Sequence, residues 1–417
     1  MEMIIKSIWM PKNLSALTFL FCCLAALLFP FSIAAVNALF FLALLLSLYT
    51  GDFKRGCILL WQKQKWLFQV ILFYLFLVAA GILWSNDKAQ GLGVLMHHSK
   101  WLLLPLILPL LMQSAKHRGA FIAALSLGLT LHLAVCVAQM FGVLHIANVA
   151  GSRASDATGY IGHISFGVSY AIWAGWLILW GKEQQSIYYK WGAWLLALWA
   201  FTMVFMAEGR SGYLSSVAVI LYLVWHIFIH GKSLKFMMTI GVLLVFSSGL
   251  VVIQLSDHPR ATQTIKSIQA IYHNDLEHAE LRVFLWMSAF DIWKQNPILG
   301  AGTGGYRGSM KQMQQDYPML VSEEKVYHSH PHQLYLLAAA RWGTVGVLTI
   351  ILLLWTWYTV GRASKNSYVS LASISALALA IHGFTSIGLE AFQPISMGMF
   401  ALALAVASQD DEDPSFV

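Results

Sequence analysis

Repeated apolar segments of about 20 residues constrain the fold of this chain more than any other feature, since that length spans a bilayer as a helix. Hydrophobic residues make up 58% of the 417 residues and charged residues only 11%, whereas a soluble domain carries about a quarter charged residues. The predicted spans are residues 14–31, 33–49, 67–84, 100–114, 120–141, 163–181, 191–206, 213–229, 236–254, 334–360, 368–388 and 394–408. The predicted fold class is all-α, a polytopic membrane protein of about 12 transmembrane helices with one long, partly helical outer loop.

The connections between these segments predict how the chain is oriented. Basic residues follow the even-numbered spans: Lys54, Arg55, Lys63, Lys65, Lys116, Arg118, Lys182, Lys190, Lys232, Lys235, Arg362 and Lys365. Because cytoplasmic connections carry an excess of Lys and Arg, we expect both termini in the cytoplasm. The chain then divides into residues 1–254 with nine spans, the long outer loop 255–333, and residues 334–417 with three spans and an acidic tail.

Charge and cysteine content exclude several classes of protein. The net charge of +7 is explained by basic residues at membrane faces, and no nucleic-acid-binding module is present, so we expect no nucleic acid partner. The four cysteines have no metal-ligand spacing and lie in or near spans, so neither a disulfide framework nor a cysteine metal site is expected. The first apolar segment lacks a clear cleavage site and is expected to be retained.

The long outer loop holds an unusual number of polar groups. We expect helices at residues 262–272 and 277–295 from their apolar spacing, the second one stopping before Pro297. Glycines at 300, 302 and 305 formally fit a dinucleotide fingerprint, but they do not follow a strand of a βαβ unit. We therefore reject that interpretation and expect a tight turn.

Three arginines lie in outer segments, at Arg153, Arg210 and Arg282. Each has an ordinary interpretation: an interfacial side chain that reaches headgroups, a pair between Arg210 and Glu208, or a solvated helix charge at Arg282. Each also has a functional one, because a guanidinium binds phosphate oxygens at two points. If the three converged, they would form a site for a pyrophosphate lipid.

The histidine run at 328, 330 and 332 is the strongest local feature. In an extended segment the three side chains would share one face. Zinc binding, a structural polar patch and proton transfer are all open, since histidine changes charge near neutral pH. No fourth metal ligand and no HExxH motif stand out.

Four short patterns together resemble the O-antigen ligase family, within the O-antigen ligase/polymerase superfamily of bacterial inner membranes. They are His332-Gln333 followed by nine residues and Gly343-Thr344-Val345-Gly346; Gly209-Arg210-Ser211-Gly212; Arg282, Trp286, Asn296-Pro297, Gly300 and Gly302; and, loosely, Arg153 with Gly159. The patterns cover about residues 150–346.

The resemblance implies transfer of a glycan from undecaprenyl diphosphate to a hydroxyl of the lipid A-core oligosaccharide, on the periplasmic side of the bacterial inner membrane. It implies a metal-independent, inverting glycosyltransferase without a cofactor, with membrane lipids around it and a periplasmic loop at 255–333. Arg210 and Arg282 would bind the diphosphate and stabilise the leaving group, with Arg153 and Gln333 as further substrate contacts. His332 would orient or deprotonate the acceptor hydroxyl.

Alternatives remain from the sequence. An O-antigen polymerase or a protein O-oligosaccharyltransferase would use the same donor, and the same arginines would serve it. A transporter or lipid flippase is a further alternative, although transporters place polar groups at mid-membrane and here most of them cluster at one face.

Overall fold

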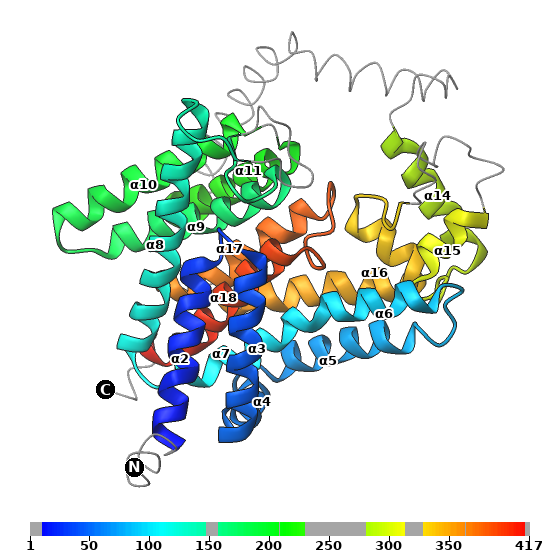
Figure 1. Cartoon of the computed structure of the whole chain (residues 1–417), viewed down its shortest axis with the longest axis horizontal. Helices are drawn as coiled ribbons and strands as arrows, with labels where there is room; N and C mark the ends of the chain where they lie inside the picture. The colour runs from blue at the N-terminus through cyan, green and yellow to red at the C-terminus, as the bar shows by residue number, and fades with distance from the viewer. Residues whose placement is uncertain are drawn as a thin grey trace.

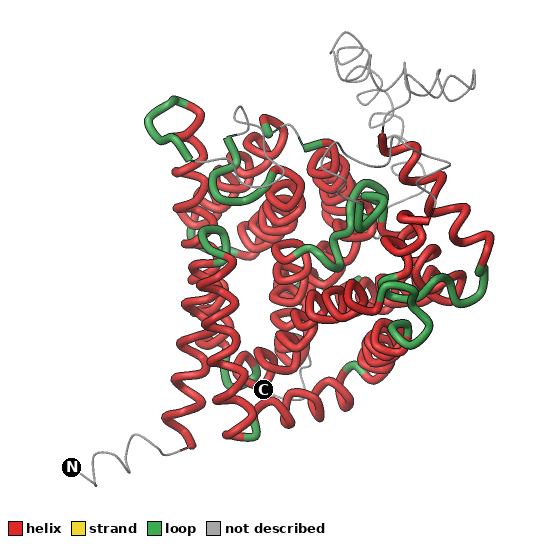
Figure 2. Tube along the Cα trace, turned by 45° about the vertical axis from the view of Figure 1, so that its right-hand side comes forward, coloured by secondary structure: helices red, strands yellow, loops and turns green. Residues whose placement is uncertain are grey.

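Helices and the loops that connect them make up the residues that the computed structural model describes, which are 11–146, 157–207, 209–229, 281–312, 328–362 and 364–412. The predicted fold class is confirmed to that extent, with no strand in these ranges (Figures 1 and 2). The main helices are α2 (Pro11–Leu28), α3 (Ile33–Thr50), α4 (Asp52–Lys63), α5 (Lys65–Ala80), α6 (Lys88–His97), α7 (Leu103–Leu111), α8 (Ala115–Met140), α9 (His163–Glu183), α10 (Ile187–Met206), α11 (Arg210–Val224), α14 (Leu281–Gln295), α15 (Gly305–Gln312), α16 (Leu334–Gly361), α17 (Ser367–His382) and α18 (Phe392–Ala407).

Seven helical segments in the described ranges are long and apolar enough to cross a membrane. They are Ile33–Thr50, Lys88–Leu111, Ala115–Met140, His163–Glu183, Ser211–Phe228, Leu334–Gly361 and Phe392–Asp411. Three shorter apolar helices, in α2, α5 and α17, also coincide with predicted spans. The predicted span 236–254 lies outside the described residues, so the total of twelve stays a prediction.

One predicted boundary is wrong. The sequence predicts an outer connection up to Ser99 and a span starting at residue 100, but α6, a short 3-10 turn η1 (His98–Leu102) and α7 form one helical path from Lys88 to Leu111. Asp87 begins this path by accepting a hydrogen bond from the Gln90 N–H at 3.0 Å, as an N-cap residue does. Helix α6 was not predicted because only a narrow face of it is buried and polar residues lie elsewhere on it.

The basic connections meet at one end of the bundle. Arg118 at the start of α8 pairs with Asp411 at 2.6 Å, and Lys63 at the end of α4 pairs with Asp410. The Glu183 carboxylate at the end of α9 accepts a hydrogen bond from Ser367 Oγ at 2.6 Å. The connections after the second, fourth, sixth and tenth predicted spans therefore share an end with residues 409–412, as the predicted orientation requires.

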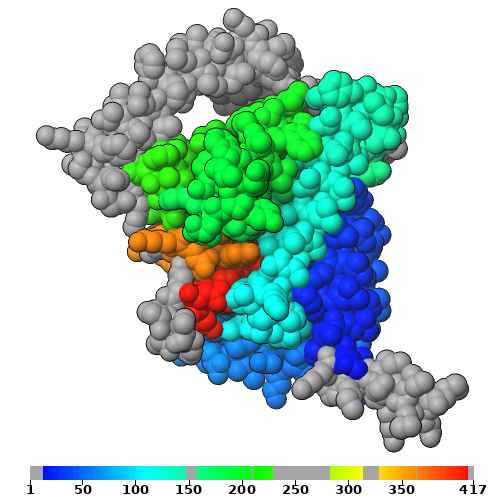
Figure 3. All heavy atoms as spheres, turned by 90° about the vertical axis from the view of Figure 1, so that its left-hand side faces the viewer, coloured from blue at the N-terminus to red at the C-terminus, as the bar shows by residue number. Residues whose placement is uncertain are grey.

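The centre of the bundle is formed by α18 and α9, whose most apolar windows are 89% and 78% buried, whereas that of α3 is only 22% buried. Helix α18 packs against α17, α7 and α9. Figure 3 shows α8 as a band between the blue N-terminal helices and the green helices of the middle of the chain.

At the other end of the bundle, α14 and α15 pack across the beginning of α16, with α15 also touching α6 (Figure 1). Their contact forms a separate small core that includes Phe284, Ile292, Tyr306 and Leu337. Helix α14 ends at Gln295, as predicted from Pro297. The segment 262–272 lies outside the described residues.

Candidate functional site

The histidine loop, residues 328–333, leads directly into α16. Gln333 caps that helix, its side-chain carbonyl accepting a hydrogen bond from the Leu336 N–H, and the Leu334 N–H donates to the Gly383 carbonyl at 2.7 Å. These contacts fix the backbone immediately after His332. The capping bond occupies the side-chain oxygen of Gln333, which leaves its amide N–H groups for the predicted substrate contact.

His332 has a left-handed backbone, with φ 54°, the one positive φ outside glycine in the described ranges. Such a conformation costs on the order of 1 kcal/mol and persists where the surroundings impose it, often at functional sites. The backbone is therefore not extended at His332, so the condition under which residues 328, 330 and 332 would share one face is not met. The His332 N–H instead donates to His330 Nδ1 at 3.3 Å, and the two rings meet edge to face at 4.3 Å.

Two further side chains donate hydrogen bonds to the backbone of the histidine loop. The Trp286 indole N–H donates to the Pro331 carbonyl at 3.0 Å, which ties α14 to the loop. Arg341, two turns into α16, donates to the Ser329 carbonyl at 3.4 Å. The strained backbone of His332 is thus imposed by contacts on both sides of it.

Arg282 and His332 are brought together. Burial, and then the positive charge of Arg282, lower the pKa of His332 to about 4. Burial and the neighbouring His332 likewise lower the pKa of His330 to about 4. Near neutral pH both imidazoles are therefore uncharged, so each can accept a proton.

A break in α16 makes room for the loop after α14. Gly343 has φ 63° and ψ −156° inside the helix, and a Cβ there would lie 2.2 Å from the Ile298 carbonyl oxygen. The Thr344 N–H donates to the Pro297 carbonyl and the Gly302 N–H to the Arg341 carbonyl, both at 2.8 Å. The backbone groups freed by the break are therefore paired with loop 296–302, as an apolar environment demands.

The glycines of loop 296–302 let its backbone approach other parts of the protein closely. Gly300 and Gly302 have φ 65° and 89°, which confirms the predicted tight turn. A Cβ on Gly302 would lie 2.5 Å from the Gly81 carbonyl oxygen at the end of α5. Thr303 completes the junction, its backbone N–H donating to the Gly81 carbonyl at 2.9 Å and its hydroxyl to the Val78 carbonyl at 2.6 Å.

A buried ion pair under the histidine loop was missed by the sequence analysis. Arg341 and Glu390 are only 2% and 7% exposed, with an N–O distance of 2.6 Å. Burial by itself would raise the pKa of Glu390, but the charge and hydrogen bond of Arg341, with His98 and His330, together outweigh it and hold that pKa below its usual value. An arginine inside an apolar segment was the available signal; its partner is 49 residues away.

The remaining predicted site residues are only partly placed. Arg210 is the first residue of α11, and its side chain lies outside what the structure describes, as does all of Arg153. A Cβ on Gly212 would lie 2.8 Å from Gly167 Cα, so this glycine lets α11 approach α9. The electrostatic effect of Arg282 on His332 is described, whereas convergence of the other two arginines is not.

Metal ligands do not cluster in the described part of the chain: no group of three His, Cys, Asp or Glu side chains is placed to hold an ion there.

Residues 195–351 match the family model described as O-antigen ligase. The match runs from within α10 into α16 and contains Arg210, Arg282, His332 and Gln333, with Arg153 before its start. A comparison with curated proteins found no match.

Proposed function

We propose that this chain, whose residues 195–351 match the O-antigen ligase family model, moves a glycan from undecaprenyl diphosphate to a hydroxyl of lipid A-core oligosaccharide. The observation that supports this most is the uncharged His332 beside Arg282. A base and a diphosphate-binding cation are the two groups that such a transfer needs next to one another.

The reaction is a single displacement with inversion. The acceptor oxygen attacks the anomeric carbon while the bond from that carbon to the diphosphate oxygen breaks, and undecaprenyl diphosphate leaves with the electron pair. The acceptor proton passes to the neutral imidazole of His332 and from there to solvent. No ATP is required, since the sugar–diphosphate bond drives the transfer.

Arg282 has two effects on this step. Its guanidinium binds the diphosphate and stabilises the negative charge of the leaving group, together with Arg210. The bound diphosphate in turn offsets the charge that lowers the pKa of His332. Donor binding therefore raises the basicity of His332 at the moment when a base is needed.

The proposal places the reaction at the periplasmic face of the bacterial inner membrane, in a chain of about twelve spans. Residues 1–254 then carry nine spans and donor-binding outer loops, 255–333 form the periplasmic loop, and 334–417 carry the last three spans. The end of the bundle with His332 lies opposite the end with the Arg118–Asp411 ion pair, which fits this orientation.

The test is incubation of the purified protein with undecaprenyl-diphosphate-linked glycan and lipid A-core, with EDTA present and absent. Glycan joined to lipid A-core in both conditions is the expected result. Lengthened lipid-linked chains would instead identify a polymerase. Glycan attached to an added protein acceptor would identify a protein oligosaccharyltransferase, and lipid movement without a new bond would identify a flippase.

A further inference from the structure

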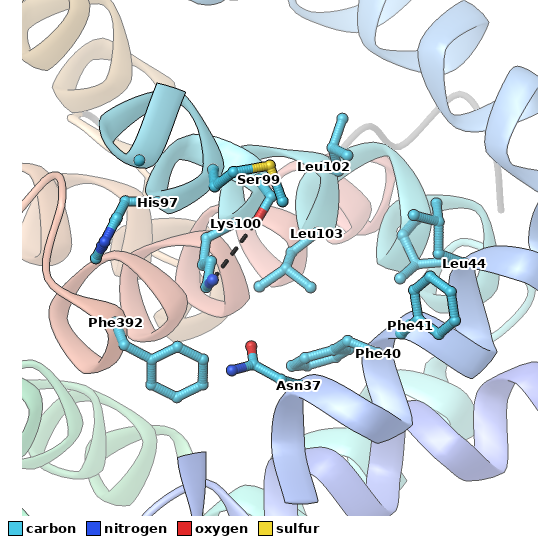
Figure 4. Close-up of a pocket in the computed structure, with 13 residues that line it drawn as sticks. Asn37, Phe40, Phe41, Leu44, His97, Ser99, Lys100, Leu102, Leu103 and Phe392 are labelled. Carbon is cyan, nitrogen blue, oxygen red and sulfur yellow. Dashed lines mark hydrogen bonds between the residues drawn. The ribbon is translucent and has the colours of Figure 1, made fainter. Parts of the chain in front are cut away.

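A cavity of about 550 Å³ lies between α3, the α6–α7 path and the start of α18 (Figure 4). Its size falls in the range of small-molecule sites, about 300–1,000 Å³. The residues described as lining it include the basic side chains Lys100 and His97 and no carboxylate. It is distinct from the site around His332, none of whose residues line it.

The cavity is polar at one end and apolar at the other. Asn37 lies in the second turn of α3, and Lys100 has its amine 5.5 Å from the ring of Phe392, the first residue of α18. These residues mark the end of the bundle that also holds the histidine loop. Phe40 and Leu44 on α3, with Leu106 on α7, continue the lining towards the opposite end.

Lys100 supplies the charge at the polar end. Its side chain is half-buried, and its amine donates to Ser99 Oγ at 3.4 Å and lies over the Phe392 ring. Figure 4 shows the side chain directed into the cavity, between Phe392 and Leu103. A cation held at the mouth of an apolar cavity complements a ligand with an anionic head and a hydrocarbon chain.

A second cavity shows that this charge is not a general feature of the lipid-facing surface. It has about 400 Å³ and lies between α5 and α16, and its described lining, which includes Phe73, Leu348 and Leu352, contains no ionisable side chain. Any lipid chain can occupy such a space, whereas the cavity at Lys100 adds recognition of a phosphate.

We propose that the cavity at Lys100 binds a phosphate and one acyl chain of the acceptor lipid. This inference rests on the proposed function, in which two lipids must be held at once. The donor is assigned to Arg282 and Arg210, which lie in the first turns of α14 and α11. No described residue of α14 or α11 lines the cavity, whose lining lies on α3, the α6–α7 path and α18. The cavity therefore belongs to the other lipid.

The contacts that link the cavity to the histidine loop support the same assignment. Phe392 follows Glu390 by two residues, and Glu390 pairs with Arg341, which holds the Ser329 carbonyl of the histidine loop. His98 in η1 also carries an electrostatic interaction with Glu390. Lys100 is thus linked to the histidine loop through Phe392, Glu390 and Arg341, and the proposal directs the sugar portion of an acceptor anchored at Lys100 towards His332.

The kinetic test uses Lys100→Met, with Lys88→Met as the control on the exposed part of the same helical path. We expect Lys100→Met to raise KM for lipid A-core about tenfold, the loss of one charge-assisted hydrogen bond, and to leave KM for the donor unchanged. Phosphatase-treated lipid A-core should be used equally by wild type and variant. A raised donor KM, or no change in either KM, would overturn the assignment.

A binding test separates this inference from the proposed function. A Cβ on Gly93, which lines the cavity, would meet no atom within 4 Å, and the same holds for Gly192 on the exposed face of α10. Native mass spectrometry with added lipid A should show binding to wild type and Gly192→Phe, and loss of binding in Gly93→Phe and Lys100→Met. Equal binding to all four proteins would contradict the assignment. If the protein bound lipid A selectively but transferred no glycan, the proposed function would be rejected and the assignment of the cavity to this lipid would stand.

Discussion

Arg282 at the start of α14 and His332 before α16 lie close enough that the guanidinium, after burial, helps to lower the pKa of His332 to about 4. We therefore expect the acid limb of kcat/KM, which reports the free enzyme, to lie near pH 4. Arg282→Met should move this limb to higher pH, because the remaining causes, burial and His328, lower the pKa less than the three together. A pH profile of kcat/KM for the donor, measured at limiting donor concentration, checks this, and an unmoved limb would remove Arg282 from the site.

Stability should also depend on pH through the histidine loop. The pKa values of His330 and His332 are about 4 in the folded protein and about 6.5 in an unfolded chain. Between these values the unfolded state binds more protons, so the free energy of unfolding falls as pH drops from about 6.5 towards 4 and is constant in this respect above 6.5. Thermal unfolding in detergent should show a weaker pH dependence in His330→Gln than in wild type.

Removal of the His332 imidazole should abolish transfer. We expect His332→Ala to reduce kcat by about 10²–10⁴-fold, the contribution of a general base, while the protein still inserts into the membrane. His332→Asn is the matched control for backbone strain, since Asn tolerates the left-handed region far better than Ala. The two variants should be equally inactive; recovery of activity in the Asn variant would mean that position 332 acts through its backbone.

The buried pair of Arg341 and Glu390 should be costly to break from one side. Arg341→Met leaves the Glu390 carboxylate buried without its partner, which destabilises by about 3–5 kcal/mol. Adding Glu390→Leu removes that uncompensated charge and should restore most of the free energy of unfolding. A double-mutant cycle on thermal unfolding measures the coupling, and additive losses would contradict it.

Gly343 should not tolerate any side chain. Its φ of 63° and the Ile298 carbonyl 2.2 Å from a built Cβ predict that Gly343→Ala loses at least about 1 kcal/mol and much of the transfer activity. Gly192→Ala is the control, on an exposed helix with open space at its Cβ, where alanine should stabilise by about 0.5–1 kcal/mol. Equal effects of the two changes would mean that loop 296–302 does not depend on the break.

The long apolar segments were predictable because a helix in lipid must satisfy its own backbone and repel charge. That logic located α3, α8, α9, α16 and α18 to within a few residues. It failed at α6, whose polar residues resemble those of a connection although Gly91 and Val94 are buried. Apolar length alone cannot recognise a helix that buries only a narrow stripe.

The site was predictable at the level of residue types, since a histidine and arginines at outer segments suit a diphosphate donor. Its geometry depends on contacts between distant parts of the chain. The left-handed backbone of His332 follows from ties to Trp286 and Arg341, and the partner of Arg341 is fixed by how α17 returns to α18. The glycines at 300 and 343 could be predicted to allow turns, but the sequence does not show that the loop at Gly300 packs against the break in α16 at Gly343.

The break at Gly343 has a consequence for the order in which the protein is made. The ribosome delivers residues 296–302 well before 340–345, yet the N–H groups of Ala301 and Gly302 bond to the carbonyls of Ala340 and Arg341. The arginine-bearing half of the site therefore has no place to dock until the tenth predicted span has been synthesised. Only a nearly complete nascent chain can assemble the site, so a polypeptide truncated before residue 340 cannot hold Arg282 at its working position.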